Sequence, residues 1–144
     1  MLVDDVKSRL SDRVPDLSGR IEGAANLVDL LRQNGLSQQA LSANLIASGL
    51  QGGAVDAASG LFRQAIDETI TVVLTFRSVG ATGAQVLDRM DEIIRAVIDA
   101  VCGWAPEASP GVFRLVRGNV ASLTAGTLVY QIDFAIADQL RIAT

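Results

Sequence analysis

The sequence predicts an α+β fold: a small mixed or antiparallel sheet of about four strands, packed against an N-terminal helix and one long amphipathic helix. Three observations favour this fold. Apolar residues recur at helical spacing over 86–101, and they alternate with polar residues over 66–78 and over 128–137. No linker or internal repeat divides the 144 residues, so we expect a single domain that spans 1–144.

The first predicted element is a helix from Leu2 to Val14. Its apolar residues fall near the spacings that place side chains on one helical face. Asp4 and Asp5 lie in its first turn, where the helix dipole favours acidic side chains. We expect the helix to stop at Pro15 and Gly19, since these two residue types interrupt helices.

The next stretch carries weaker signals. A short helix is predicted from Glu22 to Gln33, closed by an Asn-Gly pair, and a strand followed by a turn is the alternative for so short a run. Ala43–Ala47 is typical of a short strand. Ser48–Gly60 contains four glycines and few large apolar residues, so it has little to bury and much backbone entropy to lose. We therefore expect a long mobile loop over 48–62.

The clearest strand signal runs from Ile66 to Ser78. Apolar and polar residues alternate there with a period of nearly two, and β-branched residues are frequent. We expect one face of the strand to be buried and the other to meet water or a partner. The apolar face comprises Ile66, Ile70, Val72, Leu74 and Phe76, and the polar face comprises Asp67, Thr69, Thr71, Thr75 and Arg77.

The strongest predicted element is a long helix from Val86 to Val101. A capping box at Thr82–Gln85 precedes it, and a glycine and a proline follow it closely. Its apolar residues form one face and its charged residues the opposite face. Asp88, Asp91 and Glu92 therefore lie on a solvated helix face, which explains this acidic cluster without acid–base chemistry or metal binding.

Two further strands are predicted at the end of the chain. Phe113–Leu123 has an irregular pattern, with Gly118 as the expected bend or bulge. Thr124–Thr127 is typical of a hairpin turn. In the last strand, Leu128–Ala137, apolar residues at even positions alternate with smaller or polar ones.

The composition excludes several classes of site. Histidine is absent and cysteine occurs once, so Cys/His zinc sites, Ser-His-Asp triads and intrachain disulfides are excluded. The net charge of −4 argues against a nucleic-acid backbone as the principal partner. The mean hydropathy is +0.34, yet no apolar run approaches the ~18 residues of a membrane span, and the acidic start is unlike a signal peptide.

The remaining candidates for chemistry have simple structural interpretations. The glycine-rich stretch Gly49–Gly53 lacks the Lys-Ser/Thr of a P-loop. Cys102 is expected to be an inert, small apolar residue, and Trp104 is expected to close the bottom of the helix–sheet core. Arg114 and Arg117 flank two apolar residues of a predicted strand, where they either bind an acidic partner surface or remain solvated.

The order of these elements resembles that of the tail terminator, or tail completion, proteins of long-tailed bacteriophages, including prophage and gene transfer agent versions. The chain departs from the family pattern at Ser37–Ser42, where we expect a proline-containing approach to the first strand. The resembling stretches cover nearly the whole chain, and Gly103–Pro106 is the most specific. The others are Gly19–Leu27, Ala43–Ala47, Arg63–Gln64, Glu68–Leu74, Phe113–Gly118 and Tyr130–Phe134.

The resemblance implies a structural protein of the virion, assembled in the host cytoplasm, without cofactor, metal or catalysis. Such proteins form a hexameric ring that caps the tail tube, ends its polymerisation and joins the tail to the head–neck connector. The implied partners are copies of the chain, the tail tube protein and connector proteins, with no membrane and no specific recognition of DNA passing through the ring. The candidate contact residues are Arg63, Gln64, Thr69, Thr71, Arg77, Arg114 and Arg117.

Two alternatives remain open from the sequence. One is another virion component, such as a neck adaptor or a tube subunit. The other is a small α+β enzyme or ligand-binding dimer, which requires a pocket with convergent polar groups around Tyr130 or Asp133.

Overall fold

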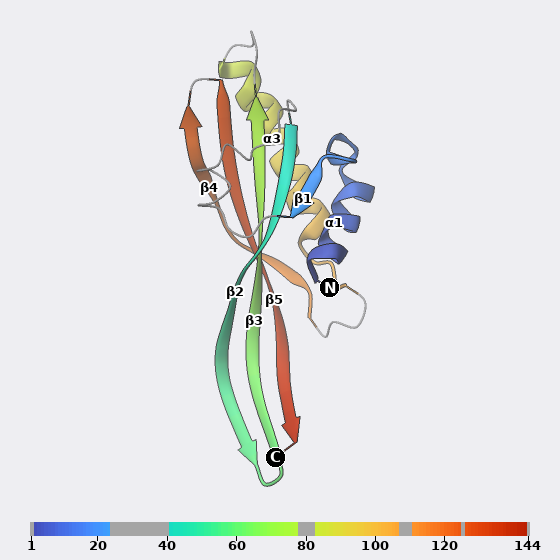
Figure 1. Ribbon diagram of the computed structural model, residues 1–144, viewed down its shortest axis with the longest axis vertical. Coiled ribbons are helices and arrows are strands. Elements are labelled where there is room, and N and C mark those ends of the chain that lie inside the picture. The colour runs from blue at the N-terminus through green and yellow to red at the C-terminus, as the bar shows by residue number, and fades with distance from the viewer. Residues whose placement is uncertain (1, 24–40, 78–82, 107–110, 125, 144) are drawn as a thin grey trace.

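The computed structural model describes residues 2–23, 41–77, 83–106, 111–124 and 126–143. Within these residues, two α-helices lie beside one five-stranded sheet (Figure 1). A short 3₁₀ helix, Pro15–Leu17, follows the first helix. The helices are α1 (Leu2–Arg13) and α3 (Gly83–Val101), and the strands are β1 (Ile21–Gly23), β2 (Leu41–Ala58), β3 (Leu61–Arg77), β4 (Phe113–Thr124) and β5 (Thr127–Ala143).

The sheet is mixed and has the strand order β1-β2-β3-β5-β4. The α+β class is confirmed, while the expected four strands become five because β1 pairs in parallel with β2, Ile21 opposite Ala43. Glu22, the expected start of the second helix, belongs to this short strand. Gly23 belongs to this strand as well, and residues 24–33 of that predicted helix lie outside the described residues, as does Thr82 of the predicted capping box.

The core lies between the two helices and one face of the upper half of the sheet, which is the half beside the helices in Figure 1. The predicted apolar faces of both helices are confirmed, since Val6, Leu10, Met90 and Val97 are all buried in it. These side chains meet alternate residues of the central strands, because every second strand residue points to the same face. The strands supply Leu45, Ile70, Val72, Leu74, Phe76, Leu128, Ile132, Phe134 and Ile136.

The opposite face of β3 departs from expectation. Thr71 and Thr75 were expected to meet water or a partner, but they are buried, at most 3% exposed, and Val73 between them is buried as well. In the neighbouring strands, Ser42 and Asp133 are buried beside them in the register. The upper half of this strand therefore has two buried faces. Thr71 is hydrogen-bonded inside the sheet, whereas the buried hydroxyls of Ser42 and Thr75 have no hydrogen-bond partner in the described part of the chain.

The predicted loop over 48–62 is wrong. β2 continues to Ala58, a two-residue turn at Ser59–Gly60 reverses the chain, and β3 begins at Leu61. Gly60 has a φ of 81°, which side chains with a Cβ rarely adopt. The low apolar content of this stretch suggested a mobile loop, but its backbone groups are satisfied by hydrogen bonds to β3. The pairing is irregular at two places, between Ala47 and Gly49 and between Gly52 and Val55.

The lower halves of β2, β3 and β5 form a three-stranded arm, defined as residues 48–69 and 137–143. Figure 1 shows the arm extending well past both helices, with the end of β5 near its tip. β5 pairs with β3 from Thr127 to Ala143 without a register shift. The arm is therefore a single layer of sheet, and no described helix covers it beyond its base.

β4 is an edge strand and pairs only with β5 among the described strands. The predicted hairpin turn is confirmed by the pairing of Thr124 with Thr127. The predicted irregularity exists, but Gly118 itself pairs regularly with Ile132. The register shifts lie on either side, between Leu115 and Arg117 and between Val120 and Ser122. Gly118 serves packing instead, since a Cβ there would meet the Tyr130 hydroxyl at 2.9 Å.

Candidate assembly surfaces

Two of the predicted contact residues, Thr71 and Arg117, meet at the carboxylate of Asp133 on β5. Thr71 Oγ1 donates to Asp133 Oδ1 at 2.7 Å, and an Arg117 guanidinium nitrogen lies 3.5 Å from Oδ2. Gln131 Nε2 donates to the same carboxylate at 3.1 Å. Thr71 Oγ1 also lies 2.8 Å from Ser48 Oγ at the base of the arm. These bonds satisfy a buried acid, as buried polar groups require.

Arg114 reaches across β5 to Asp67 on β3. Its two terminal nitrogens donate to the two carboxylate oxygens at 3.3 and 3.2 Å, a bidentate pair. The two side chains are 54% and 39% exposed, so this pair contributes little to stability in water, about 0.2–1 kcal/mol. It instead orients an exposed guanidinium on the face of the sheet that lies away from the helices.

The other predicted contact residues lie apart from these two pairs. Arg63 and Gln64 are on the arm, on opposite faces because they are adjacent in β3, and Gln64 Nε2 donates to the Gly53 carbonyl at 3.4 Å. Thr69 lies at the base of the arm, where its carbonyl accepts from Ser48 Oγ at 3.3 Å. Arg77 is at the far end of β3, opposite Thr127. The seven residues thus occupy three regions of the sheet, namely the arm, the middle of the sheet and the far end of β3. Arg63, Gln64 and Thr69 lie in the arm, Thr71, Arg114 and Arg117 in the middle, and Arg77 at the far end.

The arm carries an apolar surface that the sequence analysis missed. In the register, Leu50 lies opposite Glu68, Val55 opposite Gln64 and Phe62 opposite Ile142, which places these side chains on the helix side of the sheet. Leu50, Val55 and Ile142 are 50–64% exposed. We call this surface the arm stripe; it comprises Leu50, Val55, Phe62, Ile66, Leu140 and Ile142.

A second apolar surface runs along β4. Leu115, Val120 and Leu123 lie opposite Phe134, Tyr130 and Leu128, so they also point to the helix side, and they are 44–74% exposed. We call these three residues the β4 stripe; Val112 and Val116 beside it are exposed as well. All the large exposed apolar side chains found in the described residues belong to the arm or to β4 and its approach.

A signal for the arm was present in the sequence. Phe62 in β3, and Leu140 and Ile142 in β5, are apolar at the alternate positions that continue the core face, although Gln64, Glu68 and Asp138 interrupt the alternation. These interruptions, together with the glycine-rich stretch before β3, favoured shorter strands. The β4 stripe has no such signal, since an edge position cannot be distinguished from a central one in a single strand.

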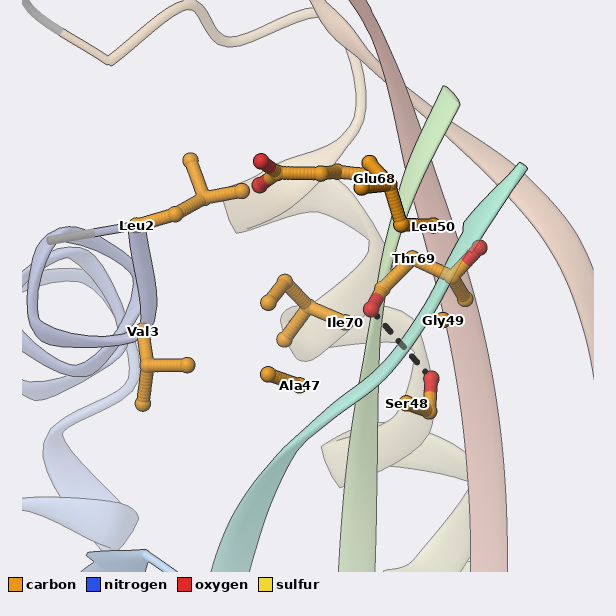
Figure 2. Close-up of a pocket in the computed structure, with 9 residues that line it drawn as sticks. All are labelled: Leu2, Val3, Ala47, Ser48, Gly49, Leu50, Glu68, Thr69 and Ile70. Atoms are coloured by element: carbon orange, nitrogen blue, oxygen red, sulfur yellow. Dashed lines mark hydrogen bonds between the residues drawn. The ribbon is translucent and has the colours of Figure 1, made fainter. Parts of the chain in front are cut away.

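A groove of about 560 Å³ lies between the start of α1 and the base of the arm (Figure 2). Leu2 and Val3 of α1 face Ile70 and the carboxylate of Glu68 across it. The walls are mainly apolar and carry a single acid, so the groove lacks the convergent polar groups of a catalytic pocket. In the described ranges there is also no cluster of three potential metal ligands.

Comparison with known families decides the class of this protein. The family model described as phage tail terminator protein matches residues 2–144. The chain belongs to this family. The resemblance drawn from the sequence is thereby confirmed, and a structural role in a phage tail follows. Membership of a tail terminator family speaks against the enzyme alternative.

The fold of this tail terminator family member also matches a solved structure. A chain of a structure described as the virion of a native gene transfer agent particle shares 14% identity with it, with a TM-score of 0.51. The match covers 94% of this chain and 92% of that chain. At this identity the likeness concerns the fold alone. No curated protein matches the sequence.

The remaining features of the described residues fit a structural protein. Burial raises the pKa of the Cys102 thiol above 9.0, against a smaller opposing effect of a backbone hydrogen bond from Leu115, so the thiol stays neutral and packs against the core as expected. Trp104 stacks on Phe113 at 5.8 Å and so covers the end of the core. None of the helices in the described ranges has both the length and the apolarity to span a bilayer.

Proposed function

We propose that this protein caps the end of a phage tail tube as a hexameric ring, ends tube polymerisation and joins the tail to the head–neck connector. The observation that carries the proposal is the family match along residues 2–144. The fold likeness to a chain of a gene transfer agent virion supports a place in the tail or neck of such a particle.

The surfaces of the described residues suit a ring. In a closed ring of identical subunits, each interface joins one patch to a different patch on the next copy. The arm stripe and the β4 stripe are two such patches, and they lie on different parts of one sheet. The net charge of −4 disfavours tight binding to DNA that passes through the ring.

The predicted polar residues supplement these patches. Arg63 and Gln64 lie on the arm, while Arg114 and Arg117 are exposed on β4. Thr69 and Arg77 lie at the base of the arm and at the opposite end of β3. Thr71 acts from inside the sheet, where it holds the carboxylate that Arg117 approaches. In the ring, these side chains contact a neighbouring subunit, the tube or the connector.

Two measurements test the function. Size-exclusion chromatography with light scattering, over a range of concentrations and with tail tubes added, is expected to show a hexamer. Electron microscopy of particles assembled without the protein is expected to show tails of abnormal length that lack heads. Tails of normal, fixed length in its absence contradict the proposal, as do long tubes formed by this protein alone.

Charge reversal tests the polar contacts. Arg63→Glu and Arg114→Glu are expected to weaken ring formation, because each places an acid where a guanidinium contacts the neighbour. Arg13→Glu, at the exposed end of α1, is the matched control and should assemble normally. Equal assembly of all three variants removes these two arginines from the interface.

A further inference from the structure

We infer that the arm of one subunit docks by its apolar stripe on the β4 stripe of the next subunit, so that the ring is closed by a repeated arm-to-edge contact. The inference rests on the proposed function, since it assumes a ring of identical copies. It adds which two surfaces meet and which residues form them.

The first argument is that the arm exposes an apolar surface that no described element covers. It is a single layer of three strands, and only its base is near α1. Leu50, Val55 and Ile142 remain at least half exposed. Sheets bury an apolar face by packing it against a second layer. Since no described part of the subunit supplies this layer, a neighbouring subunit is the expected source.

The second argument is that the same chain carries a matching surface. The β4 stripe consists of Leu115, Val120 and Leu123, beside the outer edge of the sheet. An edge strand also presents unpaired backbone groups to a neighbour. Since the described residues expose large apolar side chains only on the arm and on β4 with its approach, a ring interface between two different patches joins these two parts of the sheet.

The charges of the arm disfavour contact between two arms. The helix side of the arm carries the acids Glu68 and Asp138 and no base, because Arg63 and Arg141 point to the opposite face. β4 contains no acidic residue, and its two arginines lie on the opposite face from the β4 stripe, where they pair with acids of their own subunit. Like charges therefore disfavour arm-to-arm contact, and the β4 stripe offers no such repulsion.

The size of the arm also suits an interface between subunits. A stable protein–protein interface uses about 20–30 residues from each partner. Residues 48–69 and 137–143 number 29, and the half of them on the helix side supplies the part of such an interface that carries the arm stripe. The alternative occupant of the arm stripe is a tail tube subunit, and the crosslinking experiment below distinguishes it from a second copy of the chain.

Site-directed crosslinking tests the contact. In a Cys102→Ala background, Val55→Cys protein and Leu123→Cys protein are mixed and treated with a short bismaleimide, at ring-forming concentration and on tail tubes. We expect a crosslinked dimer of the two variants. Ser8→Cys protein, which has its thiol on the exposed face of α1, replaces the Val55 variant as the control and should yield about tenfold less dimer.

Several outcomes overturn the inference. They are equal yields with the Ser8 control, preferential pairing of Val55→Cys with itself, and crosslinks from the arm to a tube subunit instead of β4. In each of these cases, the proposed function still stands if the unmodified protein is seen to form rings. If the unmodified protein forms no ring in solution or on tubes, the proposed function fails first.

Charge insertion provides a second readout. Val55→Asp, Ile142→Asp and Leu123→Asp are expected to weaken self-association about tenfold or more, since each buries a charge in an apolar contact. Ser8→Asp is the control. Circular dichroism and thermal unfolding check that each variant is folded. Folded variants that all assemble like the control contradict the contact.

Discussion

Thr71 Oγ1 donates a hydrogen bond of 2.7 Å to Asp133 Oδ1 between the two central strands of the upper sheet. Both residues are buried, at 3% and 8% exposure. This bond explains how the sheet accommodates these two buried polar residues, since each satisfies the other in an environment where an unpaired polar group is costly.

The bond predicts strong coupling between the two positions. Asp133→Ala is expected to lower the free energy of unfolding by about 1–3 kcal/mol, because it removes the buried acceptor that Thr71, Gln131 and Arg117 share. After Thr71→Val, the same substitution should cost less, and a double-mutant cycle in urea measures the difference. Asp12→Ala on the exposed face of α1 is the control. Additive effects would show that the two side chains act independently.

Arg9 links α1 to the end of α3. Its Nε donates to the Ala100 carbonyl at 2.8 Å, and its guanidinium lies 5.2 Å from the centre of the Trp104 ring. Arg9→Ala should therefore destabilise the protein by about 1–2 kcal/mol, through loss of the charged hydrogen bond and the cation–π contact.

The emission of Trp104, the single tryptophan, is the appropriate probe of this contact. Both the unfolding midpoint and the emission of the folded state should change in Arg9→Ala. Lys7→Ala, two residues before Arg9 on a different face of α1 and exposed, should leave both unchanged. A similar result for the two variants would remove any special role for Arg9.

Gly111 lies where a side chain cannot fit. A Cβ at this position would lie 2.6 Å from the carbonyl oxygen of Ala137, a backbone atom that cannot move aside cheaply. Gly111→Ala is expected to cost about 1–3 kcal/mol in thermal or chemical unfolding. Gly49→Ala is the matched control, because nothing lies within 4 Å of its Cβ, and it should be neutral or stabilising.

Cys102 predicts a pH effect of defined sign. Burial raises the pKa of its thiol in the folded state above 9.0, so the folded protein holds this proton more tightly than the unfolded chain. The contribution of the neutral thiol to the free energy of unfolding is therefore fully present below pH 9, and it is lost as the pH rises above that value.

The measurement is the difference in unfolding free energy between the unmodified protein and Cys102→Ala. It should shrink or reverse between pH 8 and pH 10. At pH 8, alkylation of the folded protein by iodoacetamide should be slower than alkylation of the urea-unfolded chain. Equally fast alkylation would mean that the thiol is not protected.

Local patterns were sufficient for the core elements. The apolar spacing of Val6 and Leu10, and of Met90 and Val97, predicted both helices and their buried faces. The alternation around Ile70 and Ile132 predicted the central strands. These patterns can be recognised because core-facing residues recur about every 3.6 positions in a helix and every second position in a strand, and this period depends only on the local backbone.

Pairing between distant strands was not readable in this way. Gly49–Ala58 forms a strand because β3 offers it a ladder, and its composition alone favours a loop. Asp133 is buried because Thr71 lies opposite it in the register. Likewise, the order of the strands makes β4 an edge and leaves Leu123 exposed.

The family, the α+β class and the helix–sheet core thus follow from the amino-acid sequence, because short-range periodicity and the order of elements specify them. The arm, the buried polar pair and the two apolar stripes arise from which strands lie side by side. That choice depends on contacts between residues far apart in the chain, and no local pattern encodes it.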